Sequence, residues 1–245
     1  MSKFSTLIMA AGKGTRMKSD LAKVLHKINN RPMVHYVIDL AKEIESDKIV
    51  LIIGHQKEAV MKACGDLNVD FVIQEQQLGT GHAVAMAEPL FKNYDGDLLI
   101  LSGDVPLLTS DTLQKLVQTH LNSAAIATLL TAELEDPSGY GRVIRSQDGP
   151  VSRIVEQKDA NAEELKIKEI NVGIYMFKSK QLFETLKLIN NNNAQGEYYL
   201  PDVVKIYVDR GEKVIAQLAA NFDETRGINN LDQLKEAETI LRNRR

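Results

Sequence analysis

The sequence has one cysteine, Cys64, among 245 residues, so no disulfide can form within the chain. A chain without a disulfide framework is typical of a reducing compartment, and we expect a cytoplasmic location. Cys64 lies in an apolar helical pattern, which predicts a buried small hydrophobic residue rather than a nucleophile. Only five histidines are scattered along the chain, so the sequence offers no ligand set for a transition metal.

Long apolar runs and a strong excess of charge are also missing. No stretch is long enough to cross a membrane, and the apolar run over residues 4–11 is too short for a secretory signal. The formal net charge of −3 gives no overall basic surface for nucleic acid. We therefore expect neither a membrane nor a nucleic acid as a partner, and an anionic ligand would have to be held by a local cluster of cations.

Strand-like and helix-like segments alternate through the first half of the chain. Continuous apolar runs, typical of strands buried on both faces, occupy residues 48–53, 69–73 and 97–101. Helical spacing marks residues 33–44, where Pro32 suits the first turn, and residues 113–120, for which Thr109 is a good cap. This alternation predicts an α/β fold with a Rossmann-like, doubly wound, mixed but mainly parallel sheet.

The second half of the sequence is less regular. Residues 148–149 predict a hairpin turn, residues 170–177 a strand and residues 182–189 a helix. Pro201 is suited to open a helix over residues 202–209, and a further helix is expected at the C-terminal end. No linker-like stretch or internal repeat divides the chain.

The apolar run Leu7-Ile-Met9 predicts a first strand, ahead of the other three, and this strand ends in a glycine-rich loop that carries two cations. Gly12 and Gly14 permit a sharp turn with exposed backbone N–H groups, and Lys13 and Arg16 add positive charge. These features suit a polyphosphate. The spacing lacks the third small residue of the dinucleotide fingerprint, where Met17 stands, and does not match the Gly-Lys-Ser/Thr phosphate loop. A lysine-bearing surface turn is the alternative that these residues alone leave open.

Two further strand ends carry polar residues. Residues 77–82 (Gln-Leu-Gly-Thr-Gly-His) open a helical pattern after the third strand, and Gln74 is placed to contact a base edge. We expect His82 to be a packed, hydrogen-bonded helix residue rather than a catalytic one. Asp104 follows the fourth strand and is either a Mg²⁺ ligand or a cap for the next segment. Because ligands bind at the carboxyl ends of such strands, the three turns together predict a site for a nucleoside triphosphate with Mg²⁺.

Several motifs resemble those of the sugar-1-phosphate nucleotidyltransferases. They are Ala10-Ala-Gly-Lys-Gly-Thr-Arg16, Lys23-Val-Leu-His26, Gln77-Leu-Gly-Thr-Gly-His82, Gly103-Asp-Val-Pro-Leu107 and Gly139-Tyr-Gly-Arg142. Four others are similar to those of the N-acetylglucosamine-1-phosphate uridyltransferase (pyrophosphorylase) domains of bacterial bifunctional enzymes: Val155-Glu-Gln-Lys-Asp159, Glu169-Ile-Asn-Val-Gly173, Asn191-Asn-Asn-Ala-Gln-Gly-Glu-Tyr-Tyr199 and Gly227-Ile-Asn-Asn230. The resemblance runs in order from residue 6 to about residue 240.

The resemblance implies that UTP and N-acetylglucosamine 1-phosphate give UDP-N-acetylglucosamine and pyrophosphate, for peptidoglycan and lipopolysaccharide precursors. It implies Mg²⁺ as cofactor, held by Asp104 and Asn229. Lys23 would bind phosphate oxygens, and Arg16 would stabilise the leaving pyrophosphate. Because the attacking phosphate is already ionised, positioning and charge neutralisation carry the catalysis and no general base is required.

The same resemblance implies which residues contact the substrates. The loop after the first strand would support the uracil, and the Gln74 and Gly-Thr positions would read its edges, while Glu156 would accept hydrogen bonds from the sugar hydroxyls. The complete implied set is Met9, Ala10, Ala11, Gly12, Lys23, Gln74, Gly79, Thr80, Ser102, Gly103, Asp104, Gly141, Glu156, Asn171 and Asn229.

The sequence departs from the family pattern at four positions. Ala22 replaces a proline before Lys23, and Ser102 replaces a tyrosine that often precedes Gly-Asp. Val172 and Pro201 each stand in place of a threonine. The first change is expected to loosen the loop that carries Lys23, and the second to alter a sugar or base contact. None removes a charge that the mechanism needs.

The family's bifunctional enzymes continue through a long helix into a left-handed parallel β-helix domain, which acetylates glucosamine 1-phosphate and forms a trimer. This chain stops at Arg245. We expect residues 1–228 to form the nucleotidyltransferase domain and residues 229–245 the start of the connecting helix. We expect no acetyltransferase activity from this chain, and a monomer or weak oligomer.

Two alternative functions have to be weighed against this prediction. The first is a pyrophosphorylase for glucose 1-phosphate or for another base, which a panel of substrates would distinguish. The second is a catalytically silent module that senses nucleotide sugars. The residues Arg16, Lys23, Asp104 and Asn229 argue against the silent module, because it would have no use for the metal pair.

Overall fold

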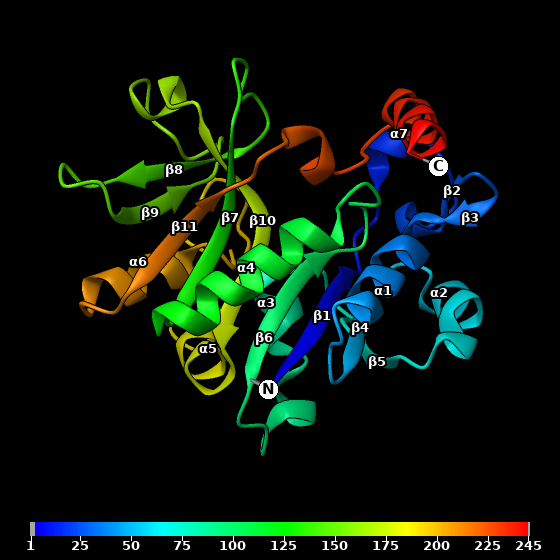
Figure 1. The fold of residues 1–245 in the computed structure, drawn as a ribbon, viewed down its shortest axis with the longest axis horizontal. Helices are drawn as coiled ribbons and strands as arrows, with labels where there is room; N and C mark the ends of the chain where they lie inside the picture. Colours follow the sequence, from blue (N-terminus) through cyan, green and yellow to red (C-terminus); the bar gives the residue numbers. More distant parts are fainter. Residues whose placement is uncertain (1–2, 245) are drawn as a thin grey trace.

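The computed structural model, which describes residues 3–244, has a nine-stranded mixed sheet whose middle contains the predicted strands over residues 48–53 and 97–101 (Figure 1). The predicted strand over residues 69–73 is instead an edge strand with exposed ends, so it is not buried on both faces. In spatial order the strands are β11 (Val214–Leu218), β7 (Ala127–Glu133), β10 (Glu169–Lys178), β6 (Asp97–Ser102), β1 (Phe4–Ala10), β4 (Ile49–Ile53) and β5 (Asp70–Ile73), with β8 (Gly141–Arg145) and β9 (Val151–Val155) attached beside β10. Along the main path β10 runs antiparallel to β6 and β7, and the other pairs are parallel. This arrangement confirms the predicted fold class.

Helices cover both faces of the sheet. They are α1 (Met33–Glu43), α2 (Lys57–Cys64), α3 (Thr80–Ala85), α4 (Ser110–Ser123), α5 (Ser179–Leu186), α6 (Asp202–Asp209) and α7 (Leu231–Asn243). Ile8 of β1 belongs to the core formed with α1, α2 and α4, whereas the adjacent Leu7 belongs to the core formed with α3, α5 and α6. Because successive strand residues point to opposite faces, a strand between two helical layers must be apolar at every position.

Most of the predicted element boundaries are close to those observed. Thr109 caps α4, with its side chain accepting from the Thr112 backbone N–H, and residues 148–149 form the turn between β8 and β9. Pro32 is the residue before α1 rather than part of its first turn. The helical pattern after His82 is interrupted, because α3 ends at Ala85 and a short 3₁₀ helix (Glu88–Phe91) with proline in its first turn follows.

The last helix packs beside the N-terminal hairpin of β2 (Lys27–Ile28) and β3 (Arg31–Pro32), although the two are far apart in the sequence (Figure 1). Ala237 of α7 joins a small core with Ile28, Met33, Leu107 and Ile228. This core anchors the segment that leads into α7, and Asn229 lies in that segment.

Cys64 ends α2 and is fully buried, as predicted, and burial raises the pKa of its thiol to about 11. Such a thiol is a poor source of thiolate, which fits a packing role. Within residues 3–244, no helix combines the length and the apolar character needed to span a membrane.

The buried histidine of α4 makes stability depend on pH. Nδ1 of His120 lies 2.9 Å from Thr128 Oγ1, and Nε2 lies 3.6 Å from Asp97 Oδ2. Burial lowers the pKa of His120 to about 4, against the attraction of Asp97 and with a smaller contribution from Lys178. The unfolded chain takes up this proton near its ordinary pKa of about 6.5, so the free energy of unfolding falls as pH drops from there toward 4.

Between pH 6.5 and pH 4, we therefore expect the free energy of unfolding to fall by about 2–3 kcal/mol less in His120→Gln than in the unaltered protein. Urea unfolding followed by circular dichroism across that range measures it, and the slope with pH is the readout rather than the absolute stability. His55→Gln, at a partly exposed histidine, is the control. An unchanged slope in the His120 variant would contradict this assignment.

Candidate functional site

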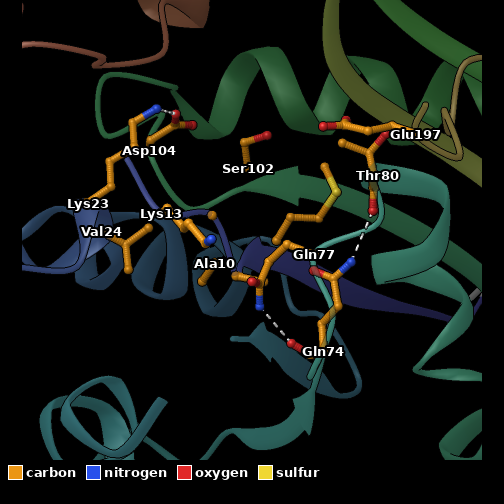
Figure 2. Close-up of a pocket in the computed structure, with 14 residues that line it drawn as sticks. Ala10, Lys13, Lys23, Val24, Gln74, Gln77, Thr80, Ser102, Asp104 and Glu197 are labelled. Carbon is orange, nitrogen blue, oxygen red and sulfur yellow. Dashed lines mark hydrogen bonds and ion pairs between the residues drawn. The ribbon is translucent and has the colours of Figure 1, made fainter. Parts of the chain in front are cut away.

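The loops that follow β1, β5 and β6 surround a cavity of about 580 Å³ at the carboxyl ends of these strands (Figure 2). We call it the larger cavity. It brings together ten of the predicted site residues: Met9, Ala10, Ala11, Gly12, Lys23, Gln74, Gly79, Thr80, Ser102 and Asp104. Lys13, predicted as a cation of the glycine-rich loop, also lines it, as do Val24, Gln77 and Glu197, for which no specific role was predicted.

A second hollow of about 190 Å³, the smaller cavity, adjoins the first. Met9, Thr80 and Ser102 line both, so the two open onto each other. The remaining lining of the smaller cavity includes the predicted residues Gly141, Glu156 and Asn171, and also Tyr140 and Tyr175.

A cluster of charged and amide groups stands at one side of the larger cavity. The Lys23 ammonium donates to the Asp104 carboxylate and, at 2.7 Å, to Asn229 Oδ1 (Figure 2 shows the first contact). Arg16 donates to the same amide oxygen at 2.8 Å. Arg16 and Asn229 line neither cavity, but these hydrogen bonds connect both of them to it.

Backbone contacts fix the relative position of Asp104 and Asn229. The backbone N–H of Ile228 donates to the Asp104 carbonyl at 2.9 Å, and that of Asn229 donates to Gln233 Oε1 at 2.7 Å. Gly103, which lines neither cavity, donates its N–H to the Met9 carbonyl at 2.9 Å and so joins the ends of β1 and β6. The two side-chain oxygens are therefore held by a strand end and by the start of α7.

The loop that carries Lys23 has a tether that proline at position 22 could not form. The backbone N–H of Ala22 donates to Gln56 Oε1 at 2.8 Å, and Gln56 Nε2 in turn donates to the Asp20 carbonyl. Proline has no N–H to donate. The loss of proline is expected to loosen the loop, but alanine at position 22 allows a hydrogen bond that restrains it.

The side-chain amide of Gln74 is held in one orientation. Its Nε2 lies 3.1 Å from the Gly79 carbonyl and 3.0 Å from His82 Nδ1. A carbonyl can only accept, so the NH₂ group faces Gly79 and the His82 ring accepts through Nδ1. His82 is thus hydrogen-bonded as expected, and burial lowers its pKa. The hydrogen bonds within residues 3–244 leave Gln74 Oε1 as an acceptor at the wall of the larger cavity.

The segment around Gly79 and Thr80, which line the larger cavity, is hydrogen-bonded to a distant part of the chain. Backbone bonds of 2.8 Å join Tyr198 N–H to the Leu78 carbonyl and Gly81 N–H to the Tyr198 carbonyl. Gly79 has φ +113°, and a Cβ there would lie 2.5 Å from the Tyr198 carbonyl oxygen. Only glycine fits this close approach.

The two cavities differ in charge. The larger cavity is lined by the cations Lys13 and Lys23 and by the carboxylates Asp104 and Glu197, and Arg16 adds a third cation just outside the lining. At the smaller one, burial raises the pKa of Glu156, and the negative charges of Asp159, Asp202 and Glu197 raise it further. Burial and Asp159 raise the pKa of Asp202 to about 6. The cations at the larger cavity can therefore bind phosphate beside the Asp104 carboxylate, and the smaller cavity suits a neutral group rich in hydrogen-bond donors.

Within residues 3–244, no group of three or more His, Cys, Asp and Glu side chains is placed to hold a metal ion. Asp104 and Asn229 form a pair of a different kind, one carboxylate and one amide. Their oxygens both accept from one cation, the Lys23 ammonium. One carboxylate and one amide oxygen, completed by water and phosphate oxygens, form a ligand set that Mg²⁺ accepts. The residues present therefore fit this ion.

Comparison with known proteins identifies a family and several related sequences. The family model described as "Nucleotidyl transferase" matches residues 5–223. The "Bifunctional protein GlmU" of Exiguobacterium sibiricum is 52% identical over 97% of this chain and 53% of its own length. The protein of the same name from Streptococcus gordonii is 50% identical over 97% of this chain and 52% of its own length. The chain thus spans about half the length of these curated relatives.

Solved structures support the fold. A UDP-glucose pyrophosphorylase complexed with UDP-glucose superposes with a TM-score of 0.78 at 19% identity, over 100% of both chains. A putative glucose-1-phosphate thymidylyltransferase from Bacillus anthracis gives a TM-score of 0.76 at 20% identity, over 97% of this chain and 94% of that one.

Proposed function

Because the chain belongs to the nucleotidyl transferase family, we propose that it joins UTP to N-acetylglucosamine 1-phosphate, giving UDP-N-acetylglucosamine and pyrophosphate. The product would serve peptidoglycan and lipopolysaccharide precursor synthesis in the cytoplasm. The observation that carries the proposal is the pair of adjoining cavities, which share Met9, Thr80 and Ser102, with the cluster of Lys23, Asp104 and Asn229 at one side of the larger one. A nucleoside triphosphate and a sugar phosphate would meet at that shared boundary.

Gln74 supports uracil as the base. Its Nε2 is used within the protein, so Oε1 is the atom left to accept from a ligand. Uracil, like thymine, carries an N3–H donor that cytosine lacks. A buried acceptor discriminates strongly against a base that leaves it unpaired, because the desolvation of that acceptor is then uncompensated.

The proposed reaction places two anions together. The sugar phosphate attacks the α-phosphorus of UTP in line, and the leaving group is pyrophosphate. Lys23 would bind phosphate oxygens and Arg16 would meet the charge that develops on the pyrophosphate. Cations at these positions stabilise the charge that develops in the transition state, so positioning and charge neutralisation are sufficient.

Asp104 and Asn229 would hold Mg²⁺ with one oxygen each. When bound, the ion neutralises charge on the phosphates and aligns them. We also propose residues 1–228 as the nucleotidyltransferase domain and residues 229–245 as the start of a connecting helix. Asn229 then belongs to the active site although it lies just beyond that boundary.

A panel of nucleoside triphosphates and sugar 1-phosphates, read by pyrophosphate release, tests the function. We expect UTP with N-acetylglucosamine 1-phosphate to give a kcat/KM at least about tenfold above any other pair, and EDTA to abolish turnover. A preference for dTTP or for glucose 1-phosphate would contradict the proposed substrates. Binding of UDP-N-acetylglucosamine without any turnover would identify a nucleotide-sugar sensor instead.

A further inference from the structure

Strand β10 contains a two-residue bulge beside the smaller cavity. Asn171 pairs with Thr131 of β7, and Tyr175 pairs with Leu129. Over this interval β10 advances four residues (171 to 175) while β7 advances two (131 to 129), so β10 carries two extra residues. Gly173 lies within the bulge at φ +82°, a conformation that glycine adopts at little cost.

The bulge brings together two side chains that a regular strand would keep apart. Residues i and i+4 of an extended strand are about 13 Å apart. Here Asn171 Nδ2 donates to the Tyr175 hydroxyl at 2.6 Å. The two residues therefore behave as next neighbours on one face of the strand.

These contacts fix the orientation of the Asn171 amide. Its Oδ1 accepts from the Gly173 backbone N–H at 3.2 Å, and a backbone N–H can only donate. One hydrogen of Nδ2 is used by Tyr175, which is 2% exposed, and the other is left over. Asn171 lines the smaller cavity, so this remaining N–H is a donor available to a ligand.

The bulge also creates the room for that ligand. On the C-terminal side of the bulge, Tyr175 to Lys178 pair with β6. On its N-terminal side, Ile170 and Asn171 pair with β8. The strand changes neighbours at this point, and the smaller cavity lies where β6 and β8 diverge, between Ser102 and Gly141. Tyr175, which holds the Asn171 side chain, therefore flanks the same bulge that makes room for the cavity.

We propose that Tyr175 is a positioning residue for the sugar phosphate: its hydroxyl holds the Asn171 amide so that one N–H points to an acceptor oxygen on the sugar. The inference rests on the proposed function. Tyr175 acts through Asn171 and stands away from the Lys23 and Asp104 cluster, so its loss affects recognition of the sugar and not the chemistry at the phosphates.

The test is Tyr175→Phe, which removes only the hydroxyl. We expect the KM for N-acetylglucosamine 1-phosphate to rise about tenfold, the effect of one hydrogen bond. We expect kcat and the KM for UTP to stay within about twofold, as for loss of uniform binding. Tyr207→Phe is the matched control, because Tyr207 is also buried in this core, near Phe177, and lines neither cavity.

A double-mutant cycle separates positioning from direct contact. In an Asn171→Ala background, Tyr175→Phe should change the KM for the sugar phosphate by less than about twofold. Additive effects would show that Tyr175 contacts the sugar itself and would overturn the positioning role. Equal KM values for Tyr175→Phe and the unaltered enzyme would overturn it as well.

Gly173→Ala provides a second route that leaves both side chains in place. No protein atom lies within 4 Å of the added Cβ, so in the ligand-free protein the change acts through the strained φ of +82°; because Gly173 also lines the smaller cavity, the NMR signal of Asn171 in this variant accompanies the kinetic readout. We expect the same selective rise in the KM for the sugar phosphate. If Tyr175→Phe folds poorly, this variant carries the kinetic test.

A readout independent of turnover distinguishes failure of this inference from failure of the proposed function. In ¹⁵N NMR of the ligand-free protein, the Asn171 side-chain amide should exchange slowly, and Tyr175→Phe should shift its signal and speed its exchange. An unchanged Asn171 signal overturns the positioning role whatever the substrate. A shifted signal in a protein without activity toward N-acetylglucosamine 1-phosphate would instead contradict the proposed substrate.

Discussion

Replacing Asp104 by asparagine is expected to lower kcat by about 10²–10³-fold or more, the typical loss when one preorganised charge is removed. Asparagine keeps the shape of the side chain and one of its oxygens. It removes the negative charge that pairs with Lys23 and that would hold Mg²⁺. The Asp104 backbone carbonyl still accepts from Ile228, so the segment that carries Asn229 stays in place. Pyrophosphate release at saturating UTP and sugar phosphate measures the effect.

The loss should be catalytic rather than structural. Asp104 and Lys23 are 19% and 15% exposed, and an ion pair that water partly reaches contributes only about 1 kcal/mol or less. The thermal midpoint should therefore change by no more than a few degrees, which differential scanning fluorimetry detects. Asp95→Asn, at an exposed carboxylate outside both cavities, is the control. Undiminished turnover in the Asp104 variant would refute the metal role.

The centre of the sheet could be predicted from the sequence because its burial is extreme. Strands β1, β4 and β6 lie between two helical layers, and their apolar runs have few other structural explanations. Strand β7 was missed because Thr128 and Thr131, both fully buried, interrupt its apolar pattern. Strand β11, an edge strand whose residues are only partly buried, was also missed. The positions of β7 and β11 depend on strand pairing, and the local sequence pattern does not encode which strands pair.

The same division holds for the site. The glycine-rich, Gly-Thr-Gly and Gly-Asp turns could be found because each collects its chemistry within a few consecutive residues. The contact between Lys23 and Asn229 joins residues 206 positions apart, and no spacing rule predicts it. The link between Asn171 and Tyr175 depends on the register of β10 against β7, a property of two strands together. Resemblance supplied Asn171 and Asn229, and the structure supplied what holds them.

Lys23→Met is expected to have two opposite effects, a loss of turnover and a gain in metal binding. The ammonium of Lys23 interacts with the oxygens of Asp104 and Asn229, which are the two proposed Mg²⁺ ligands. A lysine and a divalent ion near the same two oxygens repel each other. In the free protein, Lys23 therefore competes with the metal. Methionine keeps most of the aliphatic stem and removes the charge.

Without nucleotide, we expect the variant to bind Mn²⁺ at least about tenfold more tightly than the unaltered protein, since even a partly screened repulsion exceeds 1.4 kcal/mol at this range. Electron paramagnetic resonance of free Mn²⁺ measures the binding without any turnover. Lys18→Met, at an exposed lysine of the same loop, should leave the affinity unchanged. Adding Asp104→Asn to Lys23→Met should abolish the gain, because one of the two oxygens loses its charge.

Turnover should fall by about 10²-fold or more in the same Lys23 variant, because the cation that would bind the phosphates is gone. In the unaltered protein, UTP supplies phosphate oxygens to which the ammonium can move, and this leaves Asp104 and Asn229 to the metal. UTP should therefore strengthen Mn²⁺ binding more in the unaltered protein than in Lys23→Met. Equal strengthening in both would refute the competition. The predicted difference means that Lys23 couples the two ligands, so that metal and nucleotide enter the free site together rather than independently.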